Sequence, residues 1–320
     1  MESALPLWLE GSGLSPRSIE PLPGDLSQRQ YFRVRLVAGG SLLVAHYPSS
    51  MAASQAKFLA VQRMLDGAGV AVPRVLASGA AEGFMALEDL GEETVHDLAS
   101  AGADVGRFIG DALEQRQRIA ALEPGSVSAL GNPPLDAALL NREIDLTFAH
   151  LFEPRGIAEL GQEARDFRAS LAVLCNELGA LDPVPCHRDF MVRNLMPRND
   201  RYVVLLDFQD LRFGPPTYDL ASLLNDSWYA PAEFEERAIA KFAPGRPGLA
   251  AYRRAVVQRG LKAAGTFARF AAGGNRRHLP LIAPTLARVT PHLARLPETA
   301  RSFRRVESWW YERLSGAAFC

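Results

Sequence analysis

The sequence predicts an α+β protein with a small part that is rich in strands and a larger part that is mainly helical. Short alternations of apolar and polar residues recur over residues 1–90, with one helix among them. Helix-length apolar periodicity dominates residues 91–320. Strands that precede a run of helices, and do not alternate with them, favour α+β. We therefore expect one domain at 1–90 and a second at 91–320.

The first part begins with a short helix and a turn within residues 5–20. Gly39-Gly40 is typical of a tight hairpin turn between two strands, and Pro48 stops the second strand. The remaining predicted elements are strands or extended segments at 31–37, 41–47, 70–76 and 83–91, and a helix at 51–68 that ends at Gly69. The polar stretch 24–30 before the hairpin fits a loop whose backbone N–H groups face phosphates. An ordinary surface loop is the alternative, since no G-x-G-x-x-G occurs.

The second part has seven predicted helices and one short pair of strands. The helices are expected at 104–122, 135–152, 161–178, 216–229, 231–242, 248–271 and 279–296, and the strand pair at 195–208. The stretch 273–277 (Gly-Gly-Asn-Arg-Arg) is the best candidate for a mobile loop. We find no internal repeat.

Composition excludes several classes of protein. Hydrophobic residues make up 48% and charged residues 22% of the 320, so a sizeable core is available. The net charge of −1 gives no electrostatic argument for nucleic acid or an anionic membrane as partner. No apolar run approaches the roughly 20 residues of a membrane span, and the N-terminus lacks the pattern of a secretory signal. Three cysteines without a C-x-x-C pair support neither a zinc site nor a disulfide framework. These observations indicate a cytoplasmic protein, with a monomer as the default state.

The most informative stretch contains His187, Asp189 and Asn194, and a following apolar strand ends at Asp207. An acid in a loop can accept the proton of a hydroxyl group. The amide of Asn194 and the carboxylate of Asp207 can bind a divalent cation, and hard oxygen ligands suit Mg²⁺. These are the parts of a phosphoryl-transfer site, in which catalysis depends on positioning and charge neutralisation. The pattern predicts a small-molecule kinase with a protein-kinase-like fold.

Neighbouring residues receive structural roles. His187 suits a buried imidazole that supports the loop, and Cys186 suits a buried thiol, because adjacent side chains in a loop rarely meet for proton transfer. Asp219 precedes an apolar helix, where it either interacts favourably with the helix dipole or braces the loop of Asp189. A Ser-His-Asp hydrolase is disfavoured, because no G-x-S-x-G occurs.

The sequence resembles the aminoglycoside phosphotransferase/choline kinase family. The resemblance is carried by 187–194, by Leu206-Asp207-Phe208-Gln209-Asp210 and by Tyr218-Asp219-Leu220-Ala221. It is closest to the anomeric sugar kinases of bacterial cell-wall recycling, which phosphorylate N-acetylmuramate and N-acetylglucosamine at C1. Further similar stretches lie at 25–33, 87–91, 261–262 and 267–269.

This resemblance implies a two-lobed fold with a small β-rich N-lobe and a larger helical C-lobe. It implies ATP as co-substrate with Mg²⁺, and adenine bonded to the backbone of Glu88–Leu90. Asp189 would be the base, with Asn194 and Asp207 as metal ligands. The acceptor would be the C1 hydroxyl of N-acetylmuramate or N-acetylglucosamine, in peptidoglycan recycling.

One departure from the family pattern concerns the nucleotide. The lysine expected on the third strand is missing, and His46 stands at or next to its place. The α- and β-phosphates must therefore be held by other groups. Ser27, Arg29 and Arg33 are our candidates, and His46 would make a weaker contact.

Polar groups in the second part are candidates for acceptor binding. Gln209 and Asp210 directly follow Asp207, and Arg193 lies inside the catalytic loop. A carboxylate-bearing acceptor such as N-acetylmuramate would need a cation, for which bidentate arginine is well suited. Candidate helix residues for the acceptor site are Glu143, which lies beside Arg142, and Arg259, which has Lys262 one turn later; solvated helix-surface charges are the alternative.

Two alternatives stay open from the residues alone. In the first, the protein is a kinase whose acceptor is an aminoglycoside or an amino alcohol, although the arginine-rich C-terminal region argues against a polycationic drug. Otherwise the chain is a pseudokinase-like module that holds nucleotide without transferring phosphate, which the missing lysine favours. The trio Asp189, Asn194 and Asp207 argues against such a module, because these groups would contact the reacting phosphoryl group and its metal.

Overall fold

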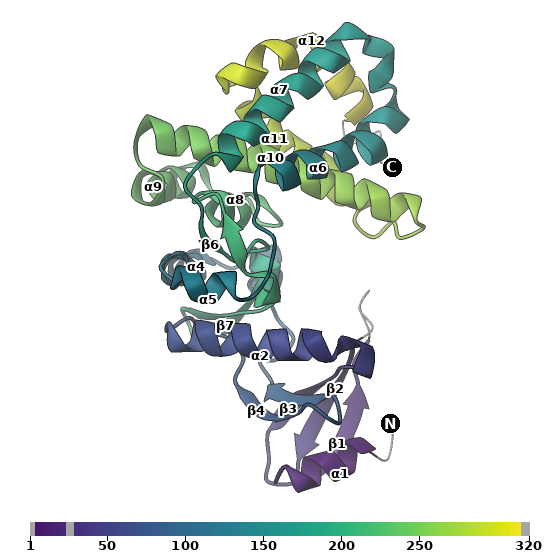
Figure 1. The fold of residues 1–320 in the computed structure, drawn as a ribbon, viewed down its shortest axis with the longest axis vertical. Coiled ribbons are helices and arrows are strands. Elements are labelled where there is room, and N and C mark those ends of the chain that lie inside the picture. Colours follow the sequence, from purple (N-terminus) through teal and green to yellow (C-terminus); the bar gives the residue numbers. More distant parts are fainter. Residues whose placement is uncertain (1–3, 24–28, 315–320) are drawn as a thin grey trace. The chain divides into compact units, whose positions relative to one another are not determined.

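The computed structural model describes residues 4–23 and 29–314. The chain forms two compact units, and each contains two segments of sequence. Unit 1 comprises Met1–Ile119 and Arg193–Asp210, and unit 2 comprises Ala120–Val192 and Leu211–Cys320. The α+β fold is confirmed, with a small antiparallel sheet in the first unit and a larger helical second unit (Figure 1). The predicted boundary at residue 90 stays a prediction.

Unit 1 contains an antiparallel sheet of five strands in the order β1-β2-β3-β5-β4. Its elements are α1 (Ala4–Gly11), β1 (Pro16–Pro21), β2 (Gln30–Leu36), β3 (Ser41–His46), α2 (Ala52–Gly67), β4 (Val75–Gly79), β5 (Phe84–Glu88), α3 (Val95–Ser100), α4 (Gly106–Ala120), β7 (Leu195–Arg198) and β8 (Tyr202–Leu205). The β2–β3 hairpin turns at Gly39 and Gly40, whose φ angles of 91° and 79° suit glycine. The predicted turn is therefore confirmed.

Helix α1 packs on one face of this sheet. Leu5 and Leu9 of α1 are buried against Val34, Val44 and Phe84 of the strands. Because side chains alternate along a strand, residues 42, 44 and 46 of β3 share this face, and residues 41, 43 and 45 point the other way. This alternation decides which residues of β3 can meet a ligand on the second face.

Hydrogen bonds of the buried Gln115 and of the backbone join the segment 193–210 to the rest of unit 1. Gln115 of α4 accepts from the N–H of Ala71 at 2.8 Å and donates to the carbonyl of Val203 at 2.8 Å. The N–H of Leu205 donates to the carbonyl of Ala71 at 2.8 Å. These bonds join α4, the segment before β4 and the strand β8, which leads to Asp207.

Unit 2 is built around the long helix α10. Its elements are α5 (Pro124–Ser128), α6 (Ala137–Thr147), α7 (Gln162–Gly179), β6 (Val184–Cys186), β9 (Arg212–Gly214), α8 (Tyr218–Asn225), α9 (Ala232–Phe242), α10 (Gly245–Ala272), α11 (Ile282–Leu293) and α12 (Pro297–Leu314). Helix α10 packs against α6, α7, α8, α9 and α11. Its approach to α6 is close because Gly265 has no side chain: an added Cβ would lie 2.5 Å from Oγ1 of Thr147.

Aromatic side chains form much of the core of unit 2. Phe152 and Phe167 contact Trp310 of α12 with ring centroids 5.9 and 6.3 Å apart. Phe303, also on α12, lies 6.3 Å from Phe167. The sequence did not predict α12, which lies beyond residue 296, nor β1.

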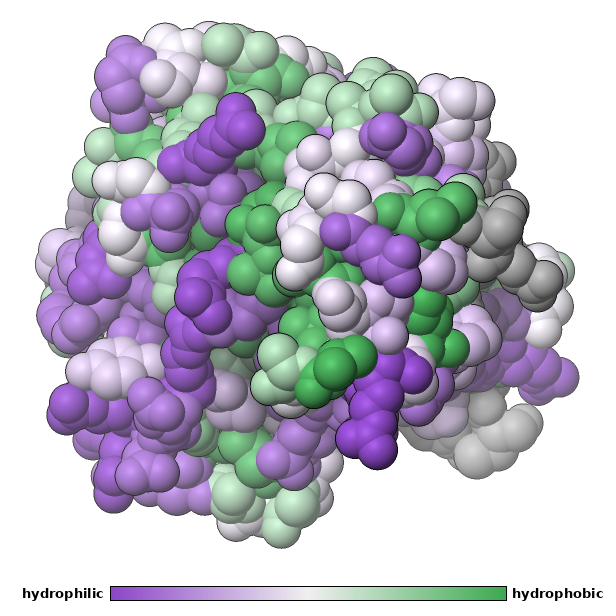
Figure 2. Space-filling view, turned by 90° about the horizontal axis from the view of Figure 1, so that it is seen from below, coloured by the Kyte–Doolittle hydropathy of each residue, from purple (hydrophilic) through white to green (hydrophobic). Residues whose placement is uncertain are grey.

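The surface carries hydrophobic residues among hydrophilic ones. Figure 2 shows such a mixture on one face. Leu7 and Val37 of unit 1 are the most exposed large hydrophobic residues in the described part of the chain, each at 68%. Among the helices described, none combines the length and apolar character that crossing a membrane requires.

Candidate active site

The loop that carries Asp189 is held by the buried carboxylate of Asp219. This loop follows β6, and Arg188 within it has a φ of 79°, a conformation that costs energy for a residue with a side chain. Asp219, at the start of α8, accepts from the N–H of His187 at 2.7 Å and from the N–H of Arg188 at 3.0 Å. Of the two roles that the sequence left open for Asp219, these contacts identify the brace.

His187 is buried, as its expected structural role requires. Its side chain is 1% exposed and its ring lies edge-on to Phe190, with centroids 5.6 Å apart. Cys186, also buried, precedes it at the end of β6. Buried side chains therefore flank Arg188 and Asp189, with His187 before them and Phe190 after them.

Asp189 lies beside two cations of α10. Arg259 Nη1 and Lys262 Nζ are each 3.7 Å from Oδ1 of Asp189. Burial by itself would raise the pKa of Asp189, but the positive charges of Lys262, Arg259 and Arg188 outweigh burial and hold the pKa at about 2. Asp189 is therefore an ionised carboxylate at neutral pH, able to accept a hydrogen bond from a hydroxyl group.

Arg259 is fixed by a second acid. Its Nη2 donates to Oδ2 of Asp226 at 3.0 Å and lies 3.8 Å from the sulfur of Met191. Burial alone would lower the pKa of Arg259, yet the charges of Asp226 and Asp189 leave it raised. The guanidinium is thus a permanent, enclosed cation with one direct hydrogen bond to an acid.

Glu143 on α6 is a further buried acid of this region. It accepts from Nε2 of Gln258 at 2.9 Å and lies 3.6 Å from Nη2 of Arg188. Tyr218 of α8 is fully buried, and its pKa is raised well above the usual value by burial and by the charge of Glu143. Unit 2 thus gathers residues from α6, α8, α10 and the loop after β6 around Asp189.

The predicted metal ligands lie in unit 1, where two short strands bring their backbones together. Asn194 ends the 3₁₀ turn Val192–Asn194, and its carbonyl accepts from the N–H of Leu206 at 2.8 Å. Asp207 has a φ of 58°, and its Oδ1 accepts from Nε2 of Gln209 at 2.6 Å. A left-handed aspartate two residues after a strand is a strained conformation of the kind found at functional sites.

The donor chemistry of Asn194 and Asp207 fits Mg²⁺. Both offer oxygen ligands, and Mg²⁺ is usually bound by one or two protein carboxylates while phosphates and waters complete its shell. Within residues 4–23 and 29–314 no cluster of three or more His, Cys, Asp or Glu residues could hold a metal.

Gln209 and Asp210, predicted for the acceptor, occupy the 3₁₀ turn Phe208–Asp210 of unit 1, and Arg193 precedes Asn194. Glu143 and Arg259, also predicted for the acceptor, belong to unit 2. The predicted motif is therefore divided: Asp189 belongs to unit 2, and its proposed metal ligands belong to unit 1.

Arg29 and Arg33, the two arginines predicted for the phosphates, have different surroundings. Arg33 on β2 binds Asp89 through Nε at 2.9 Å and pairs with Glu92. Arg29 is half-buried, and its guanidinium carbon lies 6.0 and 5.8 Å from the rings of Tyr31 and Tyr47. Arg33 thus pairs with two acids, whereas aromatic rings form part of the surroundings of Arg29.

Asp207 and Arg29 influence one another electrostatically. Burial alone would lower the pKa of Arg29, but Tyr31, Tyr47 and Asp207 leave it raised. His46 is on the opposite face of β3, where its ring lies 4.9 Å from Phe84 in the core under α1. Burial lowers the pKa of His46. This geometry favours Arg29 over His46 as a phosphate ligand.

The remaining predicted nucleotide contacts lie at the end of β5. The Glu88 side chain pairs with Arg198 and lies 3.3 Å from Nε of Arg74, so the predicted contact of this segment would come from its backbone. Leu90 follows in a short irregular segment and is half-buried. Ser27 lies outside the described residues.

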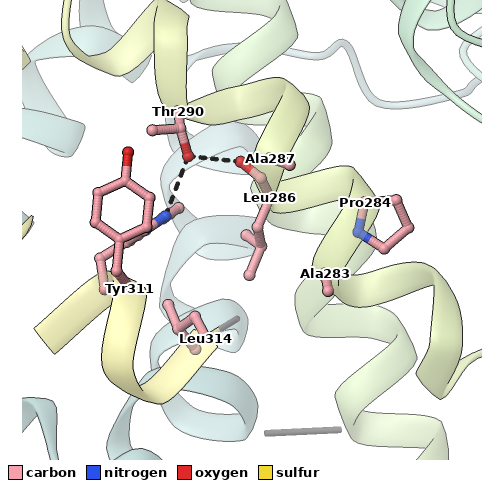
Figure 3. A pocket seen from close by; sticks show the side chains of 8 residues that line it. Ala283, Pro284, Leu286, Ala287, Thr290, Tyr311 and Leu314 are labelled. Carbon is pink, nitrogen blue, oxygen red and sulfur yellow. Dashed lines mark hydrogen bonds between the residues drawn. The ribbon is translucent and has the colours of Figure 1, made fainter. Parts of the chain in front are cut away.

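A hollow between α11 and α12 is a separate feature of unit 2 (Figure 3). Its volume is ≈ 320 Å³, and apolar side chains such as Leu286 and Leu314 line most of it. Its wall holds Thr290, whose hydroxyl accepts from Nε1 of Trp310 at 3.1 Å. The described residues that line the hollow include no Asp, Glu, His, Lys or Arg.

Comparison with known proteins relates this geometry to a family. The model of the phosphotransferase enzyme family matches residues 18–255. The chain belongs to this family. The phosphotransferase is 33% identical to an N-acetylmuramate/N-acetylglucosamine kinase of Pseudomonas putida, over 88% of this chain and 86% of that protein. It is 32% identical to the protein of the same name in Pseudomonas aeruginosa, over 94% and 92%.

Solved structures support the same fold at low sequence identity. An aminoglycoside phosphotransferase bound to ADP superposes with a TM-score of 0.62 at 16% identity, covering 94% of this chain and 99% of that chain. A choline kinase of Streptococcus pneumoniae gives 0.60 at 16% identity, covering 96% and 99%. The predicted protein-kinase-like fold with a small β-rich lobe and a larger helical lobe is confirmed, and the phosphotransferase is an enzyme of the small-molecule kinase type.

Several residues that complete these surroundings lie outside the motifs that the sequence offers. Asp226 binds Arg259, and Tyr31 and Tyr47 enclose Arg29. Only the alternation of β2 and β3 gave a usable signal, since it places residues 31, 45 and 47 on one face. Asp226 lies outside any motif, and no pattern links it to a helix 33 residues later.

Proposed function

We propose that this phosphotransferase moves the γ-phosphoryl group of ATP, with Mg²⁺, to the anomeric C1 hydroxyl of N-acetylmuramate or N-acetylglucosamine. Two relatives that match most of the chain carry these acceptors in their names. The observation that carries the proposal in the structure is the braced loop that presents an ionised Asp189 beside two cations. We expect the enzyme to act in the cytoplasm, in the recycling of peptidoglycan sugars.

In this proposal Asp189 accepts the proton of the C1 hydroxyl while the C1 oxygen attacks the γ-phosphorus. The bond between the γ-phosphorus and the bridging oxygen breaks, and its electron pair leaves with ADP. A hydroxyl at an anomeric carbon is more acidic than an ordinary alcohol, because the ring oxygen withdraws electrons. A weakly basic carboxylate such as Asp189, with a pKa of about 2, is therefore better matched to C1 than to other hydroxyls.

Asn194 and Asp207 would hold Mg²⁺, which supplies charge neutralisation for the phosphates. Arg29 would hold the α- and β-phosphates in place of the missing lysine, because its guanidinium lies beside two aromatic rings and is influenced by the charge of Asp207, the proposed metal ligand. The backbone of Glu88–Leu90 would bind adenine, and Ser27 would lie near the phosphates.

Gln209, Asp210, Arg193, Glu143 and Arg259 stay our candidates for acceptor contacts. Glu143 and Arg259 are already engaged, by Gln258 and Asp226 respectively. A contact of Glu143 or Arg259 with the sugar would therefore form in addition to these hydrogen bonds within the protein.

An acceptor screen tests this proposal. Purified enzyme with Mg-ATP would be incubated with N-acetylmuramate, N-acetylglucosamine, an aminoglycoside and an amino alcohol, and ADP release and phosphorylated product would be measured together. We expect sugar 1-phosphate from one or both amino sugars. Turnover of the drug or the amino alcohol alone would replace the proposed acceptor, and nucleotide binding without any product would indicate a pseudokinase-like module.

The role of Arg29 has its own test. Arg29→Met should raise the KM for ATP while leaving the KM for the sugar unchanged, and Arg29→Lys should recover part of the loss. Arg17→Met, which removes an exposed arginine of β1, is the matched control. Equal KM values for ATP in Arg29→Met and the control would remove Arg29 from the phosphate site.

A further inference from the structure

Arg259 and Lys262 lie at the same distance from Asp189 but differ in their other partners. Each cation is 3.7 Å from Oδ1, which is an ion pair and not a hydrogen bond. Arg259 has a side chain that is 6% exposed and a hydrogen bond to Asp226 at 3.0 Å. Its role beside Asp189 is therefore to hold charge in a fixed place.

The ammonium group of Lys262 has N–H donors that are available to a bound molecule. Its side chain is 17% exposed, and within residues 4–23 and 29–314 no acceptor lies within hydrogen-bond distance of Nζ. An ammonium group can donate three hydrogen bonds. Such a group, largely enclosed and next to the base, is placed to donate to a bound molecule.

The charges around Lys262 come from three elements. Asp189 and Arg188 lie on the loop after β6, Glu143 on α6, and Arg259 on the same helix as Lys262. Burial lowers the pKa of Lys262, and the positive charges of Arg259 and Arg188 act in the same direction, while Asp189 and Glu143 oppose them. Two acids and two other cations therefore surround the ammonium, so its charge is not cancelled by a single dedicated partner.

Geometry connects Lys262 to the attacking oxygen. A hydroxyl that donates to Asp189 places its oxygen about 2.7 Å from a carboxylate oxygen. An ammonium 3.7 Å from the same carboxylate can reach that hydroxyl oxygen by a small rotation of a flexible side chain. Negative charge develops there as the proton leaves, and a cation already in place stabilises it.

We propose that Lys262 is a catalytic residue that donates a hydrogen bond to the attacking oxygen of the acceptor. This inference rests on the proposed function. Lys262 keeps all its protons: the hydroxyl proton goes to Asp189, and the ammonium stabilises the charge that grows on the oxygen as it attacks phosphorus. The competing role for Lys262 is to anchor the carboxylate of an acidic acceptor.

Kinetics with two acceptors separate these roles. Lys262→Met should lower kcat about 10²–10³-fold for both N-acetylglucosamine and N-acetylmuramate, as loss of one transition-state donor does, with KM little changed. Lys262→Arg, which keeps the charge, should recover part of kcat. Lys241→Met, which removes an exposed lysine of α9, is the control and should match wild type.

Two kinetic results would overturn the inference. One is a Lys262→Met variant with wild-type kcat. The other is a rise in KM for N-acetylmuramate alone, which would assign Lys262 to the acceptor's carboxylate. Wild-type enzyme that makes no sugar 1-phosphate would refute the proposed function itself, whereas wild-type turnover with an unaffected variant would refute only the role of Lys262.

A footprint on the wild-type enzyme decides the matter if the variant fails to fold. The chain has three lysines, at positions 57, 241 and 262, so mass spectrometry can follow reductive methylation of each one. Saturating N-acetylglucosamine, which has no carboxylate, should slow methylation of Lys262 and leave Lys241 unchanged. An unchanged rate at Lys262 would overturn the contact.

Discussion

Removal of the Asp219 carboxylate should both destabilise unit 2 and inactivate the enzyme. Asp219→Ala leaves the N–H groups of His187 and Arg188 without their acceptor, in a place where Asp219 itself is 2% exposed. An unsatisfied buried donor costs about 1–3 kcal/mol, so the two together predict a loss of about 2–6 kcal/mol. We expect the loop of Asp189 to lose part of its order as well, because Arg188 holds a left-handed conformation that Asp219 stabilises.

Urea denaturation followed by tryptophan fluorescence measures this loss. Three of the four tryptophans, Trp228, Trp309 and Trp310, lie in unit 2, so the signal reports mainly on the unit that contains Asp219. Asp182→Ala removes an exposed acid just before β6 and should change the free energy of unfolding by less than about 0.5 kcal/mol. An Asp219→Ala variant as stable as this control, or one with wild-type turnover, would refute the brace.

Three further predictions follow from packing, charge and metal. Gly265→Ala should cost about 1–3 kcal/mol, because its methyl group would meet Thr147, whereas Gly110→Ala in α4 has open space and should be neutral or stabilising; thermal unfolding of both variants checks this. The pKa of Asp189 falls from 3.8 unfolded to about 2 folded, so its contribution of about 2 kcal/mol is present above pH 5 and lost as the pH falls towards 2; the stability gap between wild type and Asp189→Asn should close over that range, and a constant gap would contradict the ion pairs. A chelator should abolish sugar 1-phosphate formation and excess Mg²⁺ should restore it, while activity in the chelator would exclude the proposed metal.

The local motifs allowed much of the fold to be predicted from sequence. The hairpin at Gly39-Gly40 follows from the need for positive φ angles, and the helix before Gly69 follows from apolar spacing and a glycine at its end. Both features depend only on neighbouring residues. The α+β class follows in the same way, from the order of periodic segments along the chain.

Elements that depend on distant partners were missed. Helix α12 is rich in charged residues, and its Phe303 and Trp310 find their core partner in Phe167, more than 130 residues earlier. Strand β1 is bounded by Pro16 and Pro21 and lies at the edge of the described sheet, beside β2; an edge strand is where proline is tolerated. Neither partnership leaves a trace in local periodicity.

The candidate site likewise contains residues that the sequence reveals and residues that only the structure reveals. Asp189, Asn194 and Asp207 were found because spacing along the chain reflects their chemistry. The bond between Arg259 and Asp226 and the aromatic surroundings of Arg29 depend on three-dimensional packing, and no pattern of residues predicted them. Lys262 was identified as a cation near Arg259, but its approach to Asp189 required the structure.

The most direct test of the central claim compares N-acetylglucosamine with its methyl glycoside. The two sugars share every hydroxyl except that at C1, which the methyl group blocks. We predict that wild-type enzyme with Mg-ATP converts N-acetylglucosamine to an acid-labile sugar 1-phosphate and leaves the methyl glycoside untouched, and that Asp189→Asn lowers the first rate about 10²–10⁴-fold. Phosphorylation of the methyl glycoside at the same rate would show that the enzyme acts at a different hydroxyl and would contradict the account.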